Sequence, residues 1–208
     1  MDLPNYKKLI DNQLTDKLIS FFQTCKTKVI VEINGTINSL AAGVLLQKAL
    51  GEKAIALIID FDTPKTNTLI NLCESFNLNA YVLKRGLAYQ KELTTYHLHQ
   101  KDINNFYRRF VNYHLSIQAD IMGAQIVDTI DKSGRLTNQR PNCFYGSFVP
   151  FYSLYKTEVY DLAKFLNIKE TSTDHEYWEK IDPILFLLTE KQMSPEEISQ
   201  EFNIDLQW

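Results

Sequence analysis

The sequence predicts an α/β fold with a doubly wound parallel sheet, and two observations support this prediction. Short runs rich in β-branched residues alternate with longer runs that have helical apolar spacing. This strand–helix–strand rhythm is typical of parallel sheets. The segment AIALII, residues 54–59, is apolar on both faces, as expected for a strand buried between two layers of helices.

The predicted elements follow one another along the whole chain. Gly51 should end the second helix, because glycine readily adopts the conformation of a helix C-cap. Ser194 should begin the last helix, because the segment Ser-Pro-Glu-Glu supplies a cap, a first-turn proline and early acids. The predicted strands are residues 29–33, 54–59, 80–83 and 124–127. The predicted helices are residues 6–24, 39–50, 66–76, 103–119, 156–165, 183–189 and one from 194, with a loop at 135–142.

The composition indicates one continuous globular domain over residues 1–208. A net charge of -3 gives no general attraction to nucleic acid or to an anionic membrane. No apolar run approaches the roughly 20 residues that a membrane-spanning helix needs, and the N-terminus lacks the apolar core of a signal peptide. Cys25, Cys73 and Cys143 have neither zinc-site spacing nor a disulfide framework, so a cytoplasmic location is expected.

The segment NGTINS, residues 34–39, stands between a predicted strand and a predicted helix. Such a turn presents backbone amides and a helix N-terminus to a phosphate. Ligands of open parallel sheets bind at the carboxyl ends of the strands. We therefore expect three segments to meet there: residues 34–39, residues 128–134 and the turn before Lys156. Asn34 is expected to cap the helix that follows.

Four segments, taken in order, resemble the NAD synthetases of the PP-loop ATP pyrophosphatase family. Residues 34–39 stand where that family has Ser-Gly-Gly-x-Asp-Ser, and residues 128–134 stand where it has Gly-Thr-Gly-Asn-Lys-Ser-Glu. Residues 149–168 and 177–185 follow two further family patterns. Lys-Thr-Glu-Val also occurs in related ligases such as GMP synthetase, so the order of all four segments carries the resemblance. It implies an adenine nucleotide alpha-hydrolase-like fold.

The resemblance also implies a reaction and a set of site residues. In the family, ATP activates the carboxylate of deamido-NAD as an adenylate, ammonia displaces AMP, and Mg²⁺ neutralises the pyrophosphate. Without a glutaminase domain, free ammonia would be the nitrogen source, and a homodimer is expected. The implied ATP and phosphate positions are Asn34, Gly35, Thr36, Asn38, Ser39, Thr129, Lys132 and Lys156. The possible substrate contacts are Arg109, Thr171 and Ser172.

The sequence departs from the family pattern at both positions of the magnesium ligands. The family Asp is Asn38, which carries no charge, and the family Glu is Gly134, which has no side chain. Asp128 or Asp131 could supply a replacement carboxylate, or both could cap the turn. Thr36 replaces a glycine, and we expect it to disfavour the positive φ of the loop.

Several alternatives remain open from the sequence alone. Lys156 could contact phosphates or be the solvated end of a helix, and Arg108 and Arg109 could lie on an exposed helix face. The covering loop at residues 169–176 is shorter than in the family. The aromatic segment 144–155 could stack a base, form core or make a dimer contact. The spacing of His97 and His99 does not indicate a zinc site.

Three functions are consistent with these observations. The favoured interpretation is an NAD-synthetase-like protein with a degenerate ATP and metal site and impaired or absent catalysis. The second is an active ATP-dependent ligase that uses Asp128 or Asp131 for its metal. The third is a structural or regulatory dimer partner.

Overall fold

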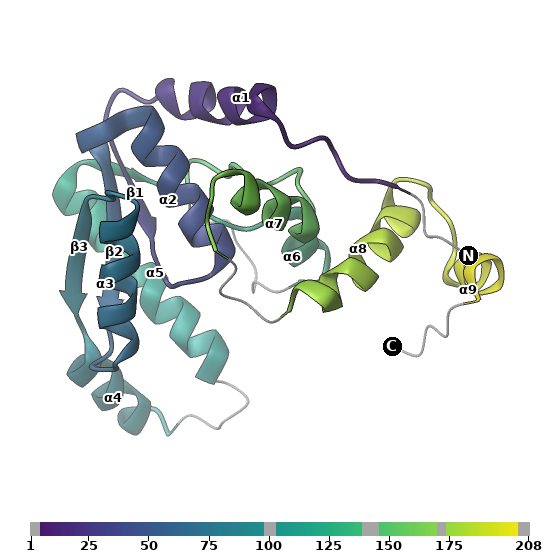
Figure 1. Cartoon of the computed structure of the whole chain (residues 1–208). Coiled ribbons are helices and arrows are strands. Elements are labelled where there is room, and N and C mark those ends of the chain that lie inside the picture. Colours follow the sequence, from purple (N-terminus) through teal and green to yellow (C-terminus); the bar gives the residue numbers. More distant parts are fainter. Residues whose placement is uncertain (1–4, 98–102, 139–145, 170–173, 204–208) are drawn as a thin grey trace.

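The computed structural model describes residues 5–97, 103–138, 146–169 and 174–203 (Figure 1). Within these ranges the central feature is a parallel sheet with the strand order β3-β2-β1-β4. The strands are β1 (Lys28–Glu32), β2 (Ala54–Asp60), β3 (Ala80–Lys84) and β4 (Ala124–Ile126). This arrangement confirms the predicted doubly wound parallel sheet, and each strand lies within about two residues of its expected bounds.

Helices cover both faces of the sheet, as the apolar pattern of β2 predicted. One face packs against α1 (Asn12–Gln23), α2 (Ile37–Leu50) and α3 (Lys65–Ser75). The other face packs against α5 (Ile103–Met122). Alternate residues of β2 divide between the two cores, with Ala56 in the first and Leu57 in the second, because successive side chains of a strand point to opposite faces.

The order of the strands creates a crevice beside β1. The chain runs from β1 to β2 and β3 on one side, and β4 pairs with β1 on the other side. The connections after β1 and β4 therefore leave the sheet in different directions. This is the topological switch point at which open α/β sheets bind ligands.

The C-terminal part of the chain packs on α2 through α7 (Lys156–Phe165), which has the bounds expected from the sequence. It is followed by α8 (His175–Thr189) and α9 (Pro195–Phe202). Ser194 caps α9 as predicted, and Glu197 returns the bond in a capping box. Gly51, with φ 53°, closes α2 and begins the short 3-10 helix η1 (Gly51–Lys53).

Some sequence-based boundaries were wrong. The first helix begins at Asn12 rather than at residue 6, because Asp11 caps it by accepting a hydrogen bond from the Leu14 amide. Figure 1 shows residues 5–10 running from α1 toward α8. Along this path the Tyr6 hydroxyl lies 2.7 Å from the Thr157 hydroxyl. Of the two apolar residues in this segment, Ile10 packs against the core, whereas Leu9 is exposed.

Three helical segments were missed or cut short. The helix α4 (Gly86–Thr95) was not predicted, since its polar sequence has weak apolar periodicity. The helix α6 (Lys132–Leu136), which Asp131 caps at its N-terminus, extends by two residues into the predicted loop at residues 135–142. The helix α8 starts eight residues before residue 183, with Pro183 inside it. Among the described residues, no helix is both long and apolar enough to cross a membrane.

Candidate functional site

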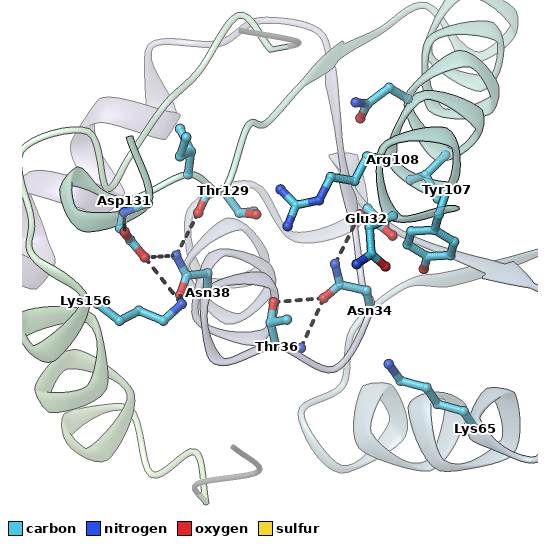
Figure 2. Close-up of a pocket in the computed structure, with 15 residues that line it drawn as sticks. Glu32, Asn34, Thr36, Asn38, Lys65, Tyr107, Arg108, Thr129, Asp131 and Lys156 are labelled. Carbon is cyan, nitrogen blue, oxygen red and sulfur yellow. Dashed lines mark hydrogen bonds and ion pairs between the residues drawn. The ribbon is translucent and has the colours of Figure 1, made fainter. Parts of the chain in front are cut away.

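A pocket of about 430 Å³ lies at the carboxyl ends of β1 and β4 (Figure 2). Its walls come from the β1–α2 loop, α3, α5, the β4–α6 loop and the start of α7. The three segments expected to meet do so. The Asn38 side chain donates to the Thr129 carbonyl at 2.8 Å, and the Lys156 amide donates to the Ser133 hydroxyl at 2.7 Å. This confirms the predicted convergence at the switch point.

The β1–α2 loop is a capped helix start. Thr36 has φ -73° and ψ 152°, and its hydroxyl accepts from the Ser39 amide at 3.4 Å. The positive φ of 86° falls on Gly35, where glycine has no steric penalty. Thr36 therefore does not need a positive φ, and the steric conflict expected at this position does not arise. Thr36 is the N-cap, and the residue expected in that role, Asn34, accepts hydrogen bonds from the Thr36 amide and hydroxyl.

A buried polar cluster joins the β1–α2 loop to the β4–α6 loop. The Lys156 ammonium donates to Asn38 Oδ1 at 2.7 Å and lies 3.3 Å from Asp131 Oδ2. Asn38 Nδ2 donates to the same Asp131 oxygen at 2.8 Å. Figure 2 shows the Lys156 side chain extending from the start of α7 to this pair. Lys156 is thus not a solvated helix end, since its side chain is only 14% exposed.

The opposite wall carries a mixed set of charges. Arg108 on α5 lines the pocket together with Glu32, Tyr107 and Lys65. Burial, and secondarily the charge of Glu32, raises the pKa of Tyr107, so its phenol remains a neutral hydrogen-bonding group. Arg109, the expected substrate contact, is exposed and is not among the described residues that line the pocket. On α5 the arginine that faces the site is Arg108.

Two of the expected phosphate-binding side chains are engaged elsewhere. The Ser39 hydroxyl donates to the Thr36 carbonyl at 2.8 Å, and Ser39 is fully buried. The Lys132 ammonium pairs with Glu190 and lies 4.4 Å from the centre of the Tyr155 ring. Neither residue is among the described residues of the pocket wall. Thr171, Ser172, Cys143 and His99 lie outside the described residues.

A second cluster, missed from the sequence, fixes the start of α7. Ser133 Oγ accepts from the Lys156 amide and donates to Asp182 Oδ1 at 2.5 Å, while Asp182 Oδ2 accepts from the Thr157 amide at 2.8 Å. Glu158 accepts from the amides of Tyr155 and Lys8. The roles of Asp182 and Glu158 were not predicted, because both residues lie in segments that match family patterns and have helical apolar spacing. Neither feature identifies a buried hydrogen-bond acceptor. The one sign of them in the sequence was that each is an acidic residue among the apolar residues of a helical segment.

Burial dominates the electrostatics of this cluster. Asp182 and Glu158 are fully buried. Burial raises the pKa of each carboxyl above its ordinary value, and the hydrogen bonds from Ser133, Thr157, Lys8 and Tyr155 oppose this rise. These hydrogen bonds partly offset the free-energy cost of burying the two carboxyl groups.

Comparison with known proteins identifies the family to which this chain belongs. The NAD synthase family model matches residues 10–174. The chain belongs to the NAD synthase family. This result confirms the resemblance and the adenine nucleotide alpha-hydrolase-like fold.

Individual relatives agree with this assignment. An NH(3)-dependent NAD(+) synthetase of Helicobacter pylori is 31% identical over 156 residues, which cover 68% of this chain and 56% of that protein. One from Pyrococcus furiosus is 23% identical over 222 residues, covering 95% and 86%. The chain thus aligns with little more than half of the H. pylori protein.

Solved structures show the same fold. The NH3-dependent NAD synthetase of Campylobacter jejuni, in complex with a nitrate ion, superposes with a TM-score of 0.71 at 23% identity, covering 94% of this chain and 93% of that one. The NMN synthetase of Francisella tularensis gives 0.75 at 19% identity, covering 93% and 92%. At these identities the likeness establishes the fold alone.

The residues at the two metal positions that the resemblance implied, Asn38 and Gly134, do not supply the groups that a magnesium ion prefers. Magnesium prefers carboxylate, phosphate and water oxygens in octahedral geometry. Asn38 offers an amide, and Gly134 offers no side chain. Asp131 Oδ1 already accepts from the Gly134 amide, and its Oδ2 faces the Lys156 ammonium. An ammonium group at that oxygen opposes a second cation.

Asp128 does not complete a metal site in this arrangement. It is buried, at 2% exposure, and its Oδ1 accepts from the Ile130 amide at 2.9 Å. No group of three or more His, Cys, Asp or Glu side chains within the described ranges is placed to hold a metal ion. Both acids do cap their turns, which was one of the two roles expected from the sequence.

Proposed function

We propose that this protein of the NAD synthase family retains a nucleotide pocket and is impaired in, or has lost, magnesium-dependent amide formation. The observation that carries this proposal is the set of groups at the two implied metal positions, where Asn38 offers an amide and Gly134 has no side chain. The nearby Asp131 carboxylate already accepts from the Gly134 amide and from Asn38 Nδ2. Adenylation of a carboxylate expels pyrophosphate, and electrostatic neutralisation of that leaving group is the main catalytic requirement.

The rest of the pocket supports retention of a nucleotide. It lies at the switch point, beside the N-terminus of α2, whose first amides lack intrahelical acceptors. Its volume of about 430 Å³ lies within the range of about 300–1,000 Å³ typical of small-molecule sites. The relatives are named NH3-dependent NAD synthetases, so an active protein with this pocket would use the substrates of such an enzyme.

The proposal also covers the number of domains, the oligomeric state and the location of the protein. The matched family region and the continuous core support one domain over residues 1–208. A homodimer in the cytoplasm is proposed from the family resemblance.

An assay of pyrophosphate release tests the proposed function. The protein is incubated with ATP, Mg²⁺, ammonia and deamido-NAD, beside the H. pylori NAD synthetase as the active control. We expect release no faster than in the absence of protein. Release at a rate within about tenfold of the control, which is a barrier difference of about 1.4 kcal/mol, would overturn the proposal and favour an active ligase. Loss of that release in Asp131→Asn would then identify the metal ligand.

A further inference from the structure

The segment at residues 5–10 has no regular secondary structure, yet it makes specific contacts with a distant part of the chain. It runs from α1 toward α8 (Figure 1). Its hydrogen bonds join residues that are 145–172 positions apart in the sequence. Local folding cannot place such a segment, so its path is set by its contacts with the start of α7 and with α8. We call residues 5–10 the strap.

Tyr6 is the strap residue whose side chain contacts both helices. Its ring packs edge-on against Tyr155, the N-cap of α7, with 5.1 Å between ring centroids, and lies 5.8 Å from the ring of Phe186 on α8. Its hydroxyl lies 2.7 Å from the Thr157 hydroxyl in the first turn of α7. Edge-on aromatic pairs stabilise a contact beyond the area that they bury. One side chain therefore joins the start of α7 to α8.

Lys7 makes a second bridge between the same two helices. Its ammonium lies 3.3 Å from a carboxylate oxygen of Asp161 on α7 and 2.9 Å from one of Glu179 on α8. The three side chains are 29–49% exposed. Ion pairs at such exposure contribute little to stability and are screened by salt. We therefore expect Tyr6, rather than Lys7, to contribute most to holding the strap in place.

The strap also shares a buried acceptor with α7. The Lys8 amide donates to Glu158 Oε1 at 2.6 Å, and the Tyr155 amide donates to Glu158 Oε2 at 2.7 Å. Glu158 is fully buried. Loss of the strap would remove one of these two donors from a buried carboxyl group, which is costly. The backbone of the strap and the start of α7 are therefore joined through one side chain.

The strap does not touch the pocket itself. None of residues 5–10 is among the described residues that line the pocket, whereas Lys156, in the first turn of α7, is one of them. Any effect of the strap on the pocket must therefore pass through the start of α7.

We infer that the strap fastens α7 to α8 from outside the pocket, and that its release opens the first turn of α7 together with the part of the pocket wall that this turn carries. Native proteins open locally in cooperative units, and the shared contacts of Tyr6 and Glu158 place the strap and this turn in the same unit. This conformational coupling does not depend on the proposed function.

Amide hydrogen exchange on the full chain, measured by NMR, tests the coupling. The amides of Tyr155, Lys156 and Thr157 each donate to a side chain and report opening of the α7 start. Tyr6→Ala should speed their exchange by about tenfold or more relative to amides of α3. Leu9→Ala, at a strap position that is 78% exposed, is the matched control and should change it by less than about twofold. Unchanged exchange in Tyr6→Ala, or an equal acceleration in α3, would overturn the inference.

A milder variant keeps the test valid if Tyr6→Ala does not fold. Tyr6→Phe retains the ring and removes the hydroxyl that contacts Thr157. It should speed exchange at the same three amides by about threefold or more, as expected for the loss of one hydrogen bond. Exchange in Tyr6→Phe equal to that of the original chain would contradict the inference.

Discussion

Two helices, α2 and α7, begin at the pocket, and their N-termini are built in opposite ways. At α2 the protein supplies one hydroxyl cap, from Thr36, and the amides of the next two residues belong to a first turn without intrahelical acceptors. At α7 three successive amides, from Tyr155 to Thr157, donate to Glu158, Ser133 and Asp182. The α2 terminus is thus open to an anion, whereas the α7 terminus already holds two carboxylates of the protein.

This comparison shows two ways in which the N-terminus of a helix can act on a pocket. An open N-terminus attracts a phosphate through its amides and its dipole. A terminus neutralised by buried carboxylates contributes no such attraction, but it holds its first side chain rigidly. In this chain that side chain is Lys156, so α7 acts on the pocket through one ammonium group. The carboxylates under α7 therefore help to position Lys156 at the pocket.

The largest expected effect comes from the α7 terminus. Asp182→Ala leaves the Ser133 hydroxyl and the Thr157 amide without their acceptor in a fully buried place. We expect a loss of about 3 kcal/mol in the free energy of unfolding, measured by urea denaturation. Asp120→Ala, at an exposed position of α5, is the control and should change stability by less than about 0.5 kcal/mol. A similar small loss in both variants would show that the α7 cluster is not stabilising.

A smaller effect is expected at the α2 terminus. Thr36→Ala removes the cap and should cost about 1 kcal/mol. Ser194→Ala removes the corresponding cap of α9, distant from the pocket in the fold (Figure 1), and should cost a similar amount. Only Thr36→Ala should also weaken ATP binding in calorimetry. Equal binding by both variants would show that the α2 terminus does not contact the ligand.

The smallest effect is a pH dependence at the α7 terminus. Burial raises the pKa of Asp182 above its ordinary value of 3.8. The folded state therefore favours the protonated acid, and its contribution to stability is lost as the pH rises through the raised pKa. The stability of the original chain relative to Asp182→Asn should fall over the interval in which the pH rises from about 4 toward neutrality. An increase over that interval, measured by urea denaturation, would contradict the burial account.

Local sequence signals predicted the frame of the site. The amphipathic stripe and flanking turn gave α7 its observed bounds, and Gly51 and Ser194 act as the caps that their residue types indicated. The rule that ligands meet the carboxyl ends of parallel strands placed the loops of β1 and β4 together. These features depend on a few neighbouring residues or on topology, so a single sequence contains them.

The contacts inside the site could not be predicted in the same way. Which residue takes the positive φ, Gly35 or Thr36, depends on how the loop enters α2. Whether Arg108 or Arg109 faces the pocket depends on the rotation of α5 against the sheet. Asn38, one of the partners of Lys156, lies 118 positions away in the chain. Such contacts are set by tertiary packing, which periodicity and residue type do not determine.

The central claim is that the residues at the implied metal positions, Asn38 and Gly134, do not hold a divalent cation. The most direct measurement is a crystal soaked with ATP and Mn²⁺, with anomalous scattering used to locate the metal. We predict no manganese peak between Asn38 and Asp131, with the Lys156 ammonium in contact with both residues. A peak coordinated by Asp131 or Asp128, with Lys156 displaced from Asn38, would contradict the claim.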